Sequence, residues 1–166
     1  ICTDPGLASI GMSDKIRGLL SNELSPTVYE ETPANPTEEA VNIALKAYKE
    51  NNCDGVIGFG GGSSMDLAKA VALMANHEGD VVDYSVNEGG VGKINETMPM
   101  IAIPTTSGTG SEVSVGSLII MNDGRKLILA SPHLMPNAAI CDPELMVGLP
   151  PILTAGAGMD ALTHCI

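Results

Sequence analysis

The stretch Asp54-Gly-Val-Ile-Gly-Phe-Gly-Gly-Gly-Ser-Ser-Met-Asp66 decides the fold of this 166-residue chain. It starts as an apolar run, Val56 to Phe59, that is typical of a buried strand. Glycines then follow without interruption from 60 to 62. Beyond them, small and apolar residues recur at three- and four-residue steps as far as about Asn76, which predicts a helix. We expect Ser63 or Ser64 to cap this helix.

A strand, a glycine loop and a helix N-terminus together predict an anion site. Glycines let backbone N–H groups approach a ligand, and the positive end of the helix dipole favours negative charge. The predicted anion is a phosphate. The alternative is that the glycines serve tight packing, because Ser63 stands where Gly-x-Gly-x-x-Gly requires glycine and no Walker lysine follows. The spacing alone leaves both interpretations open.

Composition narrows the class of protein. The net charge of −12 and the eight basic residues argue against binding to nucleic acid, which needs clustered lysine and arginine. No apolar run approaches the length of a membrane span and no signal peptide is visible, so we expect no membrane contact and a cytoplasmic location. The four cysteines are scattered without metal spacing, and we expect them to be reduced and structural.

Short aliphatic strands alternate with alanine-rich helices, a pattern that predicts an α/β fold with a parallel sheet. A pair of apolar runs around Asn122-Asp123-Gly124 predicts a β-hairpin. Expected helices span Gly6 or Ser9 to Leu24, a segment capped by Thr37 and ending at Asn51, and one turn near Val81 to Tyr84. Expected strands are residues 1–3, 27–29, 56–59, 98–103, 117–121, 126–130 and 138–141.

Leu149-Pro150-Pro151 predicts a domain boundary, since two prolines interrupt regular structure. We therefore expect an α/β domain over residues 1–149 and the start of a helical domain over residues 150–166. The chain begins inside a strand pattern and stops inside a helical one. We expect it to be a fragment of a longer protein.

Three further features carry candidate chemistry. The polar loop Pro104-Thr-Thr-Ser-Gly-Thr-Gly-Ser-Glu112 follows a predicted strand, where open α/β sheets bind ligands. Asp4 follows the first strand and is placed to accept a hydrogen bond from a ribose 2′-hydroxyl; a turn-forming role before Pro5 is equally consistent. Asp160 and His164 stand four apart, so one helix face presents both to a cation or to each other.

Four motifs in this order resemble the iron-containing (group III) alcohol dehydrogenases. They are Gly60-Gly-Gly-Ser-Ser-Met-Asp66, the polar loop 104–112, Asp142-Pro-Glu-Leu145 and Gly158-Met-Asp-Ala-Leu-Thr-His164. The resemblance extends over residues 1–166. It implies a Rossmann-like domain that binds NAD, followed by an all-α domain, with Fe2+ or alternatively Zn2+ between them.

The resemblance also implies roles for individual residues. Metal ligation falls to Asp160 and His164, with two further histidines expected beyond Ile166. The implied reaction is Lewis-acid-assisted hydride transfer between a small alcohol or aldehyde and NAD, in a full-length homo-oligomer. We expect residues 1–166 alone to lack this activity. The implied cofactor-binding residues are Asp4, Gly61, Gly62, Ser63, Ser64, Asp66, Thr105, Thr106, Thr109 and Lys126.

Two alternatives stay open at this point. A zinc glycerol dehydrogenase or a maleylacetate reductase from the same superfamily would share these motifs. The identity of the metal ligands after His164 would distinguish such a protein from an iron-containing alcohol dehydrogenase. A non-catalytic nucleotide-binding module belongs to a different class. It would require that the complete protein end near Ile166.

Overall fold

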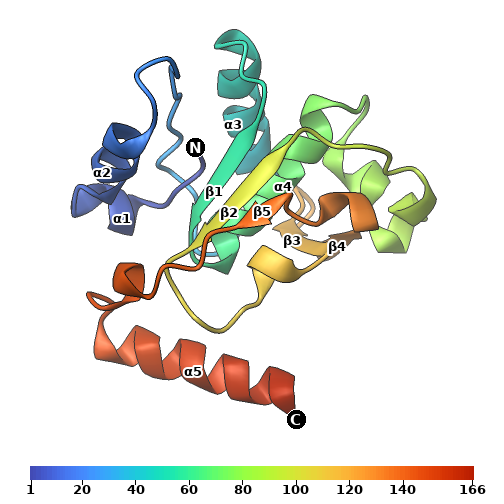
Figure 1. Cartoon of the computed structure of the whole chain (residues 1–166). Helices are drawn as coiled ribbons and strands as arrows, with labels where there is room; N and C mark the ends of the chain where they lie inside the picture. Colours follow the sequence, from blue (N-terminus) through green and yellow to red (C-terminus); the bar gives the residue numbers. More distant parts are fainter.

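The computed structural model describes residues 1–166 and has a three-stranded parallel sheet at its centre (Figure 1). The strands run in the order β1 (Val56–Gly60), β2 (Met100–Pro104) and β5 (Ala138–Ala139). Cys2 continues the sheet beyond β1 through single parallel bridges to Gly58 and Tyr29. The α/β class and the parallel sheet are therefore as the sequence predicts. The strands expected at 1–3 and 27–29 are single bridges, and β5 is shorter than the expected 138–141.

Both faces of the sheet are covered, and the side chains of its strands alternate between two cores. Val56 and Met100 belong to the larger core, which also contains α3 (Glu38–Glu50) and α4 (Gly62–Ala75). Phe59 and Ile103 point the other way and pack with Ile16 of α2 (Met12–Leu19). The short apolar strands form because both of their faces are buried.

Helix α3 begins where the sequence predicts. Oγ1 of Thr37 accepts a hydrogen bond from the amide of Ala40 (3.1 Å), so Thr37 is its N-cap. The helix packs its alanine- and valine-rich side on α4 and ends at Glu50, next to the expected stop at Asn51. Helix α4 is the most buried element, and its run of small residues allows close contact with β1.

The prediction of one continuous helix from Gly6 or Ser9 to Leu24 is wrong. The structure has two short helices, α1 (Pro5–Ser9) and α2, separated by Gly11. Gly11 has φ of 76°, a left-handed conformation that breaks an α-helix and that glycine adopts without strain. The apolar periodicity of residues 6–24 does not reveal this break.

The hairpin predicted around Asn122-Asp123-Gly124 is present as β3 (Gly116–Ile120) and β4 (Lys126–Ala130), which pair antiparallel. Ile119 and Leu129 are fully buried and pack this hairpin on the larger core beside α4. The connection between α4 and β2 contains the expected turn Val81–Tyr84 (η1) and two more, η2 (Val86–Glu88) and η3 (Gly90–Gly92). The remaining 3-10 turns are η4 (Ser111–Val113), η5 (Pro132–Leu134) and η6 (Pro143–Met146).

Helix α5 (Pro151–Cys165) lies along the lower edge of the α/β body in Figure 1 and contacts it at Gly108. It starts at the expected boundary, and none of its residues is buried. Ile152 and Met159 are 79% and 62% exposed, so its apolar side chains have few neighbours within these 166 residues. None of the helices combines the length and the apolar character that a membrane span requires. All four cysteines are free thiols.

Candidate functional site

A cavity of about 680 Å3 lies where β1 and β2 end. Carboxyl ends of parallel strands are the usual ligand-binding edge of an open α/β sheet. Its polar wall is made by the glycine loop after β1 and by Thr105 and Thr106 after β2. Apolar side chains also line it: Leu7, Ile10, Met12, Leu145, Leu149 and Leu153. The cavity therefore offers both polar groups and apolar surface to a ligand.

The backbone of the glycine loop needs glycine at position 60. Gly60 has φ of 146°, where residues with side chains are strained. A Cβ at this position would also lie 2.5 Å from Oγ of Ser64. Position 62 needs glycine because of close packing, since a Cβ there would lie 2.8 Å from Cγ2 of Thr109. A Cβ on Gly61 would meet only the side chain of Thr106, at 3.7 Å, and Gly61 lines the cavity.

The expected side-chain cap of α4 is wrong. Gly61 is the N-cap and no side chain bonds the first amides. Ser63 instead donates its hydroxyl to the carbonyl oxygen of Ala34 (2.5 Å), and Ser64 is buried with its hydroxyl unpaired. The first turn of a helix presents amides that lack carbonyl partners within the helix, and here they open on the cavity. The N-terminus of α4 is thus open to an anion.

Buried hydroxyl groups without partners gather around this N-terminus. Ser64, Thr106 and Thr32 each have such a hydroxyl, and all three residues line the large cavity. Unpaired buried polar groups are costly, and they commonly mark a site that a ligand or ordered water completes. A dinucleotide pyrophosphate fits these donors. Thr32 was not predicted from the sequence, because nothing near it in the chain signals that it lines the same cavity as the glycine loop.

Asp4 performs the turn-forming role considered above and also lines the cavity. Its Oδ1 accepts a hydrogen bond from the amide of Leu7 (3.1 Å) and caps α1. Its Oδ2 lies 3.1 Å from the place that a Cβ on Gly60 would occupy, so the carboxylate faces the glycine loop. The two interpretations of Asp4 are therefore compatible, since one oxygen serves the helix and the other faces the cavity.

A second cavity, of about 530 Å3, lies on the other side of the α4 N-terminus. Gly62 and Ser63 line both cavities, so the start of α4 stands at their boundary. Lys126 reaches this second cavity from β4 and donates a hydrogen bond to Oδ1 of Asn35 (2.9 Å). The other predicted site residues on its wall are Asp66, Thr109, Asp160 and His164.

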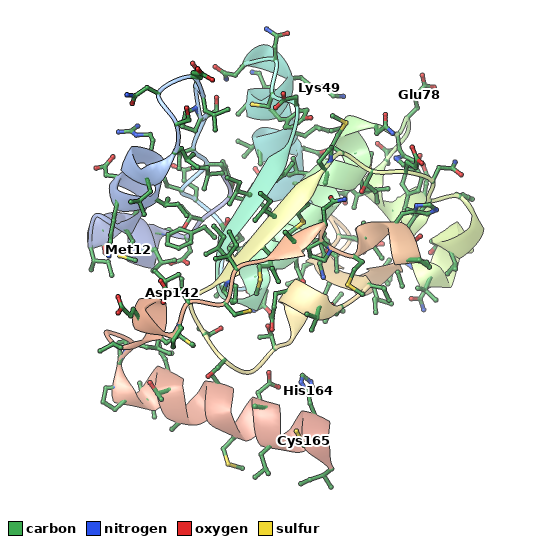
Figure 2. The ribbon with its side chains drawn as sticks, in the orientation of Figure 1. Met12, Lys49, Glu78, Asp142, His164 and Cys165 are labelled. Atoms are coloured by element: carbon green, nitrogen blue, oxygen red, sulfur yellow. The ribbon has the colours of Figure 1, made fainter.

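Asp160 and His164 share one face of α5, as their spacing predicts. Oδ1 of Asp160 lies 3.9 Å from Nε2 of His164. Figure 2 shows His164 on the side of α5 that is turned toward the α/β body. Nδ1 of His164 lies 3.2 Å from the carbonyl oxygen of Gly108. A carbonyl only accepts, so Nδ1 is the nitrogen that donates in this contact, and in the neutral tautomer of this kind Nε2 has the lone pair.

This pair fits a divalent cation in the type of its donors but not in their number. A carboxylate oxygen and an imidazole nitrogen suit iron or zinc. No group of three or more His, Cys, Asp or Glu side chains in the structure could hold a metal ion. A stable site requires additional ligands from elsewhere.

Asp66 and Lys69 connect α4 to the segment that leads into the hairpin. Both oxygens of the Asp66 carboxylate accept hydrogen bonds, from the Ser111 hydroxyl (2.6 Å) and the Leu118 amide (2.9 Å). Burial raises the pKa of Asp66, and these two hydrogen bonds oppose the change. Lys69 is fully buried, and burial lowers its pKa to about 8. Nothing in the sequence signals a role for Lys69, because its partners lie more than 40 residues away.

Comparison with known proteins places this geometry in a family. Residues 1–143 match the family model of iron-containing alcohol dehydrogenases. Over its whole length the chain is 50% identical to a 4-hydroxybutyrate dehydrogenase from Cupriavidus necator, of which it covers 44%.

Solved structures agree with this match. A 1,3-propanediol oxidoreductase superimposes with a TM-score of 0.91 and 35% identity over 98% of this chain and 42% of its own. A sulfoacetaldehyde reductase from Bifidobacterium kashiwanohense in complex with NAD+ gives a TM-score of 0.87 and 33% identity, over 95% of this chain and 42% of its own. The chain spans less than half the length of these relatives.

Proposed function

Because the chain belongs to the family of iron-containing alcohol dehydrogenases, we propose that it forms the NAD-binding part of a metal-dependent alcohol dehydrogenase. Residues 1–149 are the nucleotide-binding domain and residues 150–166 begin a helical domain. One observation carries the proposal: the uncapped N-terminus of α4 stands at the boundary of two cavities. Asp4 lines one of them, and Asp160 and His164 line the other.

The pyrophosphate of NAD binds at this boundary. Gly61, Gly62 and Ser63 offer backbone amides at the positive end of the α4 dipole, and Ser64 and Thr106 add hydroxyl groups. Two phosphates that span the boundary would carry one half of the dinucleotide into each cavity. This explains why an acidic chain with few lysines can hold a dianionic group, since backbone amides replace basic side chains.

The adenosine half lies in the larger cavity. Its apolar wall suits a purine ring, and the free side of the Asp4 carboxylate suits a ribose 2′-hydroxyl that donates a hydrogen bond. The same negative charge would repel a 2′-phosphate. The preference for NAD over NADP therefore follows from Asp4.

The nicotinamide half lies in the second cavity, between the hairpin and α5. Lys126 and Thr109 line this cavity and approach the nicotinamide riboside. Asp160 and His164 lie on the same wall, so the hydride acceptor and the alcohol meet in one chamber. Helix α5 would also exclude water from it when further helices cover its apolar side.

Asp160 and His164 provide two of the metal ligands, and the remainder come from residues outside this chain. The hydrogen bond between His164 Nδ1 and Gly108 fixes the tautomer that leaves Nε2 available, as is common for ligating histidines. When bound, Fe2+ or alternatively Zn2+ supplies Lewis-acid polarisation of the substrate oxygen, and NAD supplies the hydride acceptor. The protein residues orient the two reactants.

The substrates are small alcohols and the corresponding aldehydes or ketones. Similar proteins are named for 4-hydroxybutyrate and 1,3-propanediol, which are short and carry a primary hydroxyl. Association into a homo-oligomer stays a prediction for the full-length protein.

The test is NADH formation by the full-length protein with a panel of short primary alcohols. After treatment with a chelator, activity should disappear, and Fe2+ or Zn2+ should restore it. Activity that survives complete removal of metal, confirmed by elemental analysis, would contradict the metal-dependent mechanism. Absence of NAD binding by the metal-loaded protein would contradict the nucleotide site.

A further inference from the structure

We infer that Asp66 and Lys69 are positioning residues, which hold the segment 111–118 as a wall of the nicotinamide cavity. The inference rests on the proposed function, because that assigns the nicotinamide to the second cavity. It differs from a direct cofactor contact, the role first expected for Asp66. It also assigns a positioning role to Lys69, which has no role in the proposed function.

Asp66 is bonded to this segment at three points. Its Oδ1 accepts from the hydroxyl of Ser111 (2.6 Å) and its Oδ2 from the amide of Leu118 (2.9 Å). Its backbone carbonyl accepts from the hydroxyl of Ser117 (2.8 Å). Both carboxylate oxygens are therefore occupied by the protein itself. A cofactor contact would have to compete with these bonds.

Lys69 follows one helical turn later and holds the centre of the same segment. Its Nζ donates to the carbonyl oxygen of Ser114 (2.9 Å), to the hydroxyl of Ser114 (3.0 Å) and to the carbonyl oxygen of Gly116 (2.8 Å). An ammonium group has three protons, and here three acceptors match them. The side chain is 0% exposed. A buried charge is costly unless it is fully hydrogen-bonded, so this complete set of partners accounts for its presence.

The segment lines one cavity and not the other. Six of its residues line the second cavity, and none lines the larger one. Helix α4 therefore fixes two parts of the site: its first turn holds the pyrophosphate, and its next turns hold the nicotinamide wall. The six residues are Ser111, Ser114, Val115, Gly116, Ser117 and Leu118.

This separation allows a positioning role to be distinguished from general loss of structure. ADP is a probe of the larger cavity and the pyrophosphate site, whereas NAD also needs the second cavity. The informative variants of the full-length protein are Lys69→Met, which keeps length and removes the donors, and Ser111→Ala, which removes one bond to Asp66. Val113→Ala is the matched control, since Val113 is in the same segment but is 62% exposed and lines neither cavity.

Calorimetric titration should show that Lys69→Met weakens NAD binding about tenfold or more and Ser111→Ala about threefold. Both should bind ADP within about twofold of wild type, as should Val113→Ala with either ligand. Amide hydrogen exchange in residues 111–118 should rise in both variants. Ser111→Ala also covers the case in which Lys69→Met does not fold.

Equal loss of ADP and NAD affinity in folded variants would overturn the inference, because it would indicate a general structural role. Unchanged NAD affinity in Ser111→Ala with a large loss in Asp66→Ala would also overturn it, in favour of direct contact by Asp66. Failure of the wild-type protein to bind either ligand is a different result. It would contradict the proposed nucleotide site itself.

Discussion

His164 and Gly108 are joined by the 3.2 Å approach of Nδ1 to the Gly108 carbonyl oxygen, although 56 residues separate them in the chain. At the same point the backbone of α5 touches the polar loop after β2. A Cβ on Gly108 would overlap the carbonyl group of Ala157. The loop that follows β2 therefore sets the position of the helix that carries Asp160 and His164, the proposed metal ligands.

Gly108→Ala should displace α5 and weaken metal binding. The new methyl group cannot fit against the Ala157 backbone, so the His164 contact to Gly108 is lost with the displacement. We expect at least a tenfold loss of metal affinity, about the size seen when a partner of a ligating histidine is removed. Gly156→Ala is the control, because a Cβ there meets nothing within 4 Å. Equal metal affinity in the two variants by competitive chelator titration would contradict the account.

Asp160→Ala and His164→Ala should each abolish metal retention by the full-length protein. Removal of one ligand from a site of three or four leaves too few donors for stable binding. Thr163→Ala is a suitable control on the same helix, since its hydroxyl bonds only the carbonyl of Met159. Elemental analysis after desalting gives the metal content directly. Full metal occupancy in either ligand variant would rule out this pair.

Asp4→Gly should relax the preference for NAD over NADP, but it also removes the cap of α1 at a cost of a few tenths of a kcal/mol. Asp4→Asn separates the two effects, because the amide oxygen keeps the cap while the negative charge disappears. We expect kcat/KM for NADP relative to NAD to rise about tenfold or more with Asn, since a charge repulsion is removed. No increase with either substitution would exclude a role for Asp4 in cofactor choice.

Lys69 should make stability depend on pH in alkaline solution. Its pKa is about 8 in the folded chain and near 10.5 in the unfolded chain. Between these values the unfolded state holds a proton that the folded state has released, so raising the pH favours folding. The gain is about 3 kcal/mol at most. The facing carboxylates of Asp66 and Glu112 oppose the lowering.

Urea unfolding at several pH values between about 7 and 10 gives the free energy of unfolding of the wild type and of Lys69→Met. The wild-type value minus the Lys69→Met value measures this effect. The difference should rise with pH. A flat or falling curve for Lys69→Met would show that Lys69 does not titrate in this window.

The parts of the fold that were predictable depend on neighbours in sequence. Val56 to Phe59 forms a strand and Thr37 caps α3 because short apolar runs and oxygen-bearing caps act within a few residues. The break at Gly11 was missed because a left-handed glycine inside an otherwise periodic stretch leaves little trace in composition.

Site residues expected from the sequence line the two cavities, but their hydrogen-bond partners were not predictable. Ser63 was expected to cap α4, yet its hydroxyl reaches Ala34, a partner 29 residues away. Thr32 and Lys69 were missed for the same reason, since their roles come from contacts with distant segments. The proximity of Asp160 and His164 on α5 was predictable, because the two residues are one helical turn apart.

The most direct test of the account is a crystal structure of the full-length protein with NAD and a divalent metal ion. The account predicts the pyrophosphate on the amides of Gly61 to Ser64, the adenine in the cavity beside Asp4, and the nicotinamide in the cavity that contains Lys126, Asp160 and His164. A pyrophosphate bound away from the N-terminus of α4, or a nicotinamide in the cavity beside Asp4, would contradict it.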